Sequence, residues 1–132
     1  MKVRQLIPAM MLVVLISSCQ TISQKISGNY SGTYSVSGPG ITNTAGTDGS
    51  LSITADGDNQ VDMVFSSSGN PNVNMSNVPV TDIFGQIIFN LNNTMPAEAE
   101  VTGTLAAGNI LAITYENTID SISLSCSGFS KQ

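Results

Sequence analysis

Apolar and polar residues alternate along most of the chain after residue 27. The segment Tyr30-Ser31-Gly32-Thr33-Tyr34 shows the pattern, in which every second side chain is suited to one buried face of a strand. The pattern recurs along the chain, and seven strands are predicted, covering 30–36, 51–55, 61–65, 87–91, 99–105, 111–115 and 122–126. Val73–Met75 together with Val78–Val80 predicts an irregular eighth strand.

Residues typical of turns separate these strands. Gly38-Pro39-Gly40, Asp48-Gly49, Gly69-Asn70-Pro71 and Gly108-Asn109 are four such places. No stretch after residue 18 shows helical periodicity. Short strands about ten residues apart predict an all-β antiparallel domain, which is either a closed barrel of about eight strands or a β-sandwich.

Two glycines favour the barrel. Gly32 and Gly103 fall on the inward faces of otherwise regular strands. A missing side chain there suits a sharp bend or the close approach of two backbones, as in a sheet that coils and closes.

The first eighteen residues have the composition of an export signal. Lys2 and Arg4 form a short positive segment, and Leu6 to Ile16 form an apolar one. This run is too short to cross a bilayer, because ~30 Å of hydrocarbon needs about 20 helical residues. Residues 1–18 are therefore predicted to be a signal peptide.

The apolar run ends on Ile16-Ser17-Ser18-Cys19, which resembles the lipobox of bacterial lipoproteins. The resemblance implies that the signal is cut before Cys19, that its thiol carries diacylglycerol, and that the new amino terminus receives a fatty acid such as palmitate. Gln20 stands where aspartate is the usual signal for inner-membrane retention, so the resemblance implies a cell-envelope protein at the outer membrane. Residues 19–27 are predicted to be the lipidated end and a polar tether, and 28–132 the barrel domain.

Removal of the signal changes the charge of the chain. It leaves 114 residues, enough for one domain, with Lys25 and Lys131 against nine acidic residues and a formal charge of −7. With no arginine left to neutralise phosphates, nucleic-acid binding is excluded. Electrostatic attraction to anionic lipid headgroups is excluded for the same reason.

Several short motifs of the domain resemble the calycin-like, lipocalin-related β-barrel lipoproteins of Gram-negative bacteria. They are Gly28-Asn29-Tyr30-Ser31-Gly32-Thr33-Tyr34, the segment Val73 to Val80, Leu111-Ala112-Ile113-Thr114-Tyr115 and Leu124-Ser125-Cys126-Ser127-Gly128-Phe129. Gly28-x-Tyr30 looks like the family's opening glycine and aromatic, with tyrosine replacing tryptophan. The resemblance implies an up-and-down barrel whose last strand pairs with its first. It transfers no binding site, because the family has no single ligand.

Few residues are suited to catalysis or metal binding. The chain has no histidine, which removes Ser-His and Cys-His dyads and the commonest metal ligand. Glu98 and Glu100 share the polar face of one strand, and Asp56 to Asp62 matches a calcium loop less well than a hairpin turn. We therefore expect no enzyme, no metal and no cofactor. With Cys19 acylated, Cys126 is expected to be a buried free thiol, the alternative being an intermolecular disulfide.

The inward residues offer the one candidate binding site. They are Tyr30, Tyr34, Met63, Phe65, Phe89, Leu111 and Tyr115. They either line a cavity for a small apolar or amphipathic ligand or fill the barrel as its core. The small residues Gly32, Ala97, Ala99 and Gly103 would leave room for such a ligand. The alternative is a structural or interaction module with a solid core that contacts envelope proteins or glycans, and Val64, Ile88 and Ile110 on the outer wall are candidates for such a contact.

Overall fold

The computed structural model describes residues 20–92, 99–106 and 109–132. In these residues the chain forms the short helix α2 (Ile22–Ile26) and eight strands. The strands are β1 (Gly28–Ser37), β2 (Ala45–Ala55), β3 (Gln60–Ser66), β4 (Val73–Ile83), β5 (Gln86–Asn92), β6 (Ala99–Ala106), β7 (Ile110–Asn117) and β8 (Ile122–Lys131). In this part of the chain no helix is long and apolar enough to cross a membrane.

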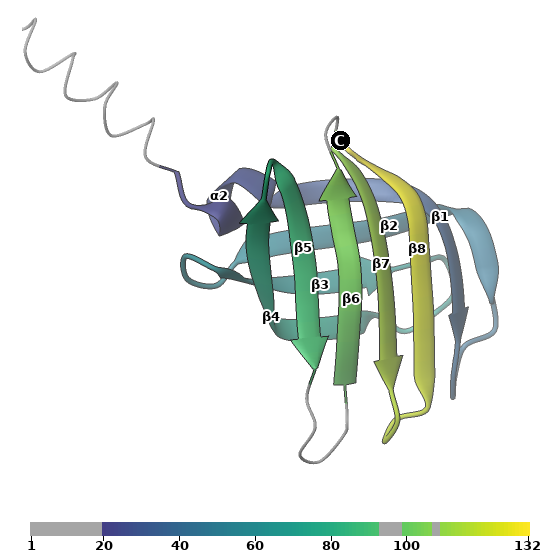
Figure 1. The fold of residues 1–132 in the computed structure, drawn as a ribbon. Coiled ribbons are helices and arrows are strands. Elements are labelled where there is room, and N and C mark those ends of the chain that lie inside the picture. The colour runs from purple at the N-terminus through teal and green to yellow at the C-terminus, as the bar shows by residue number, and fades with distance from the viewer. Residues whose placement is uncertain (1–19, 93–98, 107–108) are drawn as a thin grey trace, which may run out of the picture.

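The eight strands form a closed antiparallel barrel in which each strand pairs with its neighbours in sequence (Figure 1). β1 pairs with both β2 and β8, so the last strand closes the barrel on the first. The predicted up-and-down barrel is confirmed, and the alternative of a β-sandwich is wrong. Closure leaves no open strand edge, which protects such a sheet from pairing with other chains.

β1 bends where it crosses from one side of the barrel to the other. In Figure 1 it runs above β2 and then turns down beside β8. The pairing register shifts between Gly32 and Tyr34 toward β2, and between Ser31 and Thr33 toward β8. Gly32 therefore lies at the bend, as the sequence predicted, because a residue without a side chain suits a bulge there.

The alternation of the sequence matches the inside and outside of the barrel. β7 has exposed residues at Ile110, Ala112, Thr114 and Glu116 and buried residues between them. The irregular strand β4 keeps Met75 and Val78 both inward, although they are three positions apart. Asn77 takes the extra place with a φ of 56°, a conformation that asparagine tolerates well, and its N–H donates to Asp62 Oδ1 at 2.9 Å.

Residues 20–27, expected as a polar tether, contain the helix α2. Thr21 Oγ1 accepts a hydrogen bond from Gln24 N, and the Gln24 side chain accepts one from Thr21 N. This capping box satisfies donors at the start of the helix. Ser23 and Ile26 are buried, so the helix is docked against the barrel.

Two turns differ from the predictions. Asp48 and Gly49 were predicted to form a turn, but both lie inside β2. Gly49 is needed there because a side chain at this position would meet the rings of Tyr34 and Phe65. The tight turn between β4 and β5, at Phe84 and Gly85, was not predicted from the sequence.

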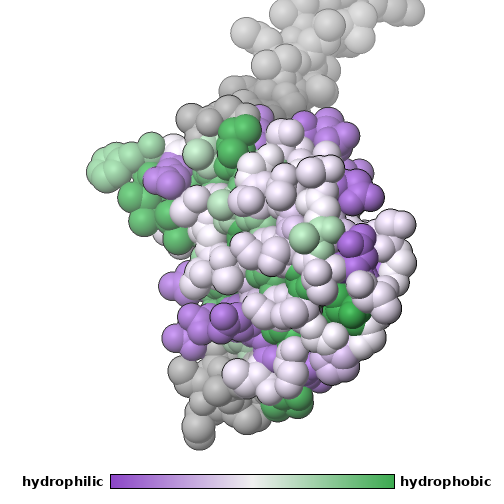
Figure 2. Space-filling view, turned by 90° about the vertical axis from the view of Figure 1, so that its right-hand side faces the viewer, coloured by the Kyte–Doolittle hydropathy of each residue, from purple (hydrophilic) through white to green (hydrophobic). Residues whose placement is uncertain are grey.

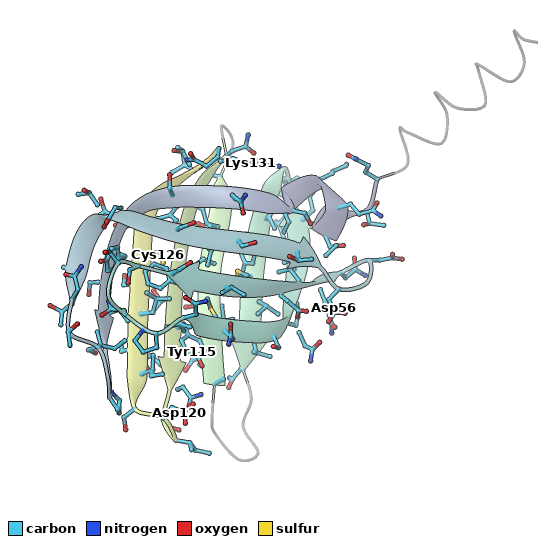
Figure 3. The ribbon with its side chains drawn as sticks, turned by 180° about the vertical axis from the view of Figure 1, so that it is seen from behind. Asp56, Tyr115, Asp120, Cys126 and Lys131 are labelled. Atoms are coloured by element: carbon cyan, nitrogen blue, oxygen red, sulfur yellow. The ribbon has the colours of Figure 1, made fainter. Side chains whose placement is uncertain are left out.

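The up-and-down order places alternate connections at opposite ends of the barrel. We call one end the N-terminal rim: it holds α2, the β2–β3 turn at 56–59, the β4–β5 turn at 84–85, the adjoining ends of β6 and β7, and residue 132. The other end, the distal rim, holds the connections at 38–44, 67–72 and 118–121. Figure 3 shows Lys131 at the upper end of the molecule and Asp120 at the lower end.

Candidate functional site: the barrel interior

All seven residues predicted to line the interior are buried, and they lie in one hydrophobic core. Their exposed fractions are Tyr30 0%, Tyr34 2%, Met63 0%, Phe65 1%, Phe89 1%, Leu111 0% and Tyr115 4%. They lie on four strands, and the alternation described above turns each of them inward: Tyr30 and Tyr34 are on β1, Met63 and Phe65 on β3, Phe89 on β5, and Leu111 and Tyr115 on β7.

The three tyrosines place their hydroxyl groups toward the rims. Tyr30 Oη donates to the Ile26 carbonyl oxygen at 2.7 Å, and burial raises the pKa of this phenol. Tyr34 Oη accepts from Asn43 Nδ2 at 3.0 Å, and Tyr115 Oη accepts from Asn117 Nδ2 at 3.1 Å. The polar atoms of these side chains are thus paired with residues of α2 or of the distal connections.

The room expected beside the small residues is occupied. A Cβ atom on Gly32 would lie 2.7 Å from Phe129 Cδ1, and one on Gly49 would lie 2.7 Å from Tyr34 Cδ1. A Cβ atom on Gly103 would overlap the carbonyl oxygen of Ala112. The space directly beside Gly32 and Gly103 is therefore taken by neighbouring atoms, whereas a ligand elsewhere in the interior stays a prediction. Ala99 packs against the core, and Ala97 lies outside the described residues.

Aromatic rings supply much of this filling. The rings of Tyr34 and Phe65 meet edge to face, with centroids 5.1 Å apart and planes at 60°. Phe129 also approaches Gly49, where a Cβ atom would lie 3.0 Å from Phe129 Cζ. Such ring pairs add about 0.5–1.5 kcal/mol beyond the burial of their area.

Buried polar groups of the described residues have partners. No buried side-chain nitrogen or oxygen in residues 20–92, 99–106 and 109–132 lacks a hydrogen bond. Ser23, which is fully buried, donates from Oγ to the Gly57 carbonyl oxygen. The described interior therefore offers no unpaired polar atom to orient a ligand.

Cys126 is a free thiol in the barrel wall, as predicted. Its exposed fraction is 2%, and burial raises the pKa of the thiol to about 12. The thiol is therefore protonated and unreactive at neutral pH. Cys19 lies outside the described residues.

The acidic residues that the structure describes form no cluster that could hold a metal ion. Asp56 to Asn59 form the β2–β3 turn, in which Asp56 N donates to the Gln60 carbonyl oxygen at 2.9 Å. No group of three metal-ligating side chains occurs among the described residues. Glu100 is exposed on β6, and Glu98 lies outside the described residues.

The outer wall contains an apolar feature that the sequence reasoning only partly identified. Of the three outward residues predicted, Val64 and Ile88 are half-buried and Ile110 is 46% exposed. Ile83 and Phe84 were not singled out, yet they are 51% and 106% exposed. Figure 2 shows hydrophobic side chains protruding at the upper left of the molecule.

Comparison with known proteins supports the fold. No family model matches the chain, and no curated protein matches it. It is similar to a protein of Bacteroides fragilis whose crystal structure is described as that of a "putative outer membrane protein", with 21% identity and a TM-score of 0.50. The match covers 84% of this chain and 52% of that one, so the chain spans about half the length of its neighbour.

This likeness shows the fold alone. Membership of the calycin-like family, which the sequence motifs suggested, is not confirmed by it.

Proposed function

We propose that this chain is a non-enzymatic, lipid-anchored module of the bacterial cell envelope, located at the outer membrane. Its barrel interior is a structural core, and its outer surface makes the functional contacts with envelope proteins or glycans. The observation that carries this proposal is the filling of the interior beside Gly32, Gly49 and Gly103. An interior occupied by its own side chains leaves the surface as the place of function.

The proposed anchor is Cys19. The lipobox-like Ile16-Ser17-Ser18-Cys19 follows a signal-like segment, and the similar structure is described as that of a "putative outer membrane protein". Each buried methylene of an acyl chain contributes about 0.8 kcal/mol, so two or three chains would hold the protein on the membrane permanently.

The absence of enzymatic activity rests on the composition. The chain has no histidine. Its Cys126 thiol is buried, and burial raises the pKa of that thiol to about 12. The remaining candidates are carboxylates, and none of those on the described residues is buried.

A variant with one cysteine removed tests the anchor. Cys19→Ala should move the protein from the membrane fraction to the soluble fraction and abolish the acyl mass on its amino terminus. Cys126→Ala is the matched control, because it removes the other cysteine of the chain. Undiminished membrane association of Cys19→Ala, or an unmodified thiol in the wild-type protein, would overturn the anchor.

Native mass spectrometry tests the solid core. Protein purified from its own envelope should carry no mass beyond its covalent acyl groups. A retained lipid or other small apolar molecule would favour the rival function, a ligand-binding barrel.

A further inference from the structure

Three exposed apolar side chains lie on the N-terminal rim, within the span of the four adjacent strands β4 to β7. Ile83 and Phe84 form the tip of the β4–β5 hairpin, and Ile110 begins β7. The strands connect these places, because Gln86 pairs with Ile83, Ile87 pairs with Leu105, and Ile110 pairs with Ala106. A groove of about 340 Å³ beside them is lined by Phe84, Gly85, Gln86 and Ala106.

Phe84 has an unusual backbone conformation for a bulky residue. Its φ is 53° and that of Gly85 is 86°, so both central residues of the two-residue turn are left-handed. Such turns favour Asn-Gly, whereas a bulky residue at positive φ is a rare and strained choice. The other non-glycine residues at positive φ in the described chain are asparagine or serine. The most exposed apolar residue on the tip is thus also the least suited to the turn that presents it.

The chain enters the barrel at this same rim. Only residues 20 and 21 separate Cys19 from α2, and Ser23 fixes that helix to the β2–β3 turn through Gly57 and Asp58. Three extended residues span about 10 Å. A lipid on Cys19 therefore has only a short link to a docked helix, which brings this rim close to the bilayer surface.

The start of the helix and the apolar hairpin are neighbours. Ile22 lines a groove of about 460 Å³ together with Thr81 and Asp82, which directly precede Ile83 on β4. The short link and the exposed tip therefore belong to one side of the barrel. A bilayer held by the anchor would therefore face the exposed side chains of the hairpin.

We propose that the N-terminal rim is a membrane-contact surface, in which Ile83, Phe84 and Ile110 enter the lipid interface beside the anchor. This inference rests on the lipid anchor proposed above. The partner is the apolar and interfacial region of the bilayer, since amphipathic surfaces bind there by burying apolar area. The contact holds the barrel in one orientation, with the distal rim directed away from the membrane.

The charges of the rim fit an apolar contact better than a headgroup site. Lys25 and Lys131 are both here, and Lys131 Nζ donates to the Lys25 carbonyl oxygen at 3.2 Å. Asp56, Asp58 and Asp82 lie on the same rim and outnumber the two lysines by one. We therefore expect the contact to form on neutral phosphatidylcholine and to be insensitive to salt.

Tryptophan reporters can test the orientation, because the chain has none of its own. The acylated Phe84→Trp protein is placed on phosphatidylcholine vesicles with or without bromine atoms in the acyl chains. Its emission should shift to shorter wavelength on the vesicles and lose most of its intensity with the brominated lipid. Ile119→Trp is the matched control, since Ile119 is 64% exposed on the distal rim, and it should show neither change.

The outcomes separate this inference from the anchor. Equal responses of the two variants in an acylated, vesicle-bound protein would overturn the membrane-contact surface while leaving the anchor standing. A protein that carries no acyl group overturns the anchor and, with it, the stated basis of the contact. Phe84→Asn, which suits the turn, should keep the fold and the anchor while increasing the rotational freedom of a spin label on the barrel; unchanged freedom would also count against the contact.

Discussion

At the distal rim, side-chain amides hold the connections together, whereas at the N-terminal rim a docked helix does so and a strained hairpin carries exposed apolar side chains. Asn70 Oδ1 accepts from the backbone of Thr42 and Asn43, and its Nδ2 donates to the Asn43 carbonyl oxygen and to Ser67 Oγ. Asn117 Oδ1 accepts from the backbone of Ile119 and Asp120. The two ends of one barrel can thus be built for different surroundings.

The two lysines lie at one end of the barrel. Both lysines of the described chain are on the N-terminal rim, together with Asp56, Asp58 and Asp82, whereas Glu100, Glu116 and Asp120 are on or near the distal rim. Among the described residues the distal rim therefore has acidic side chains and no lysine, which suits contact with water. The N-terminal rim and the distal rim therefore differ through the sequences of their turns rather than through those of the strands.

The largest expected effect concerns the wall that joins the rims. Gly103→Ala places a methyl group against the Ala112 carbonyl oxygen, which belongs to the backbone and cannot rotate away. We expect the free energy of unfolding to fall by about 3 kcal/mol, as measured by chemical denaturation. A loss below about 1 kcal/mol would show that the wall can open there, and the ligand-binding alternative would gain support.

Asn70→Ala tests the hydrogen bonds that the Asn70 side chain makes at the distal rim. It removes four hydrogen bonds of a partly exposed side chain, so we expect a loss of about 2 kcal/mol in the free energy of unfolding. Asn72→Ala is the control, because the exposed Asn72 lies in the same connection. Equal effects of the two variants would show that the hydrogen bonds of the Asn70 side chain do not stabilise this rim.

Alkaline pH tests the interior between the rims through Cys126. In the unfolded chain the thiol loses its proton near its ordinary pKa of 9.0, whereas the folded chain keeps it until about 12. The stabilisation is complete below pH 9 and is lost as the pH rises, at about 1.4 kcal/mol per pH unit between these values. Stability curves for the wild-type protein and Cys126→Ala should converge over that range. Parallel curves would contradict the burial of the thiol.

Ser23→Ala tests the attachment of α2 to the N-terminal rim. It removes the hydrogen bond from the buried Ser23 Oγ to the Gly57 carbonyl oxygen, and we expect a loss of about 1 kcal/mol. Hydrogen exchange should become faster in α2 and unchanged at the distal rim. Lys25→Ala, on the exposed side of the same helix, is the control.

Phe84→Asn should produce the smallest change and one of opposite sign. Asparagine suits the left-handed conformation of this turn, so we expect a gain of about 0.5 kcal/mol in thermal or chemical unfolding. Phe84→Ala should not show this gain. A loss of stability in Phe84→Asn would mean that the phenylalanine stabilises the fold, and the comparison between the rims would need revision.

The strands could be predicted because alternation is a local property of the sequence. The inward residues from Tyr30 to Tyr115 follow directly from it, as does the irregular strand around Asn77. The choice of a barrel over a sandwich depended on Gly32 and Gly103, and the structure explains both by a bulge and a close backbone approach.

A filled core was one of the two alternatives from the sequence, but the side chains that fill each place could not be predicted, because they come from residues far apart in the chain. Gly32 looks like empty space until Phe129, nearly a hundred positions later, is known to cover it. The helix α2 has five residues, too few for periodicity, although Thr21 and Gln24 have the spacing of a capping box. The turn at Phe84 has no asparagine or aspartate at its centre, so its signal was weak.

The pairing of β1 with β8 has a consequence for how the protein is made. Ser31 and Gln132, 101 positions apart, are joined by a side-chain hydrogen bond, and the two strands share a full ladder. The barrel cannot close until β8 has been synthesised. Contacts of such long range are formed slowly, so a newly made chain passes through a stage with two open strand edges. Deletion of β8 would leave the strand edges of β1 and β7 open permanently.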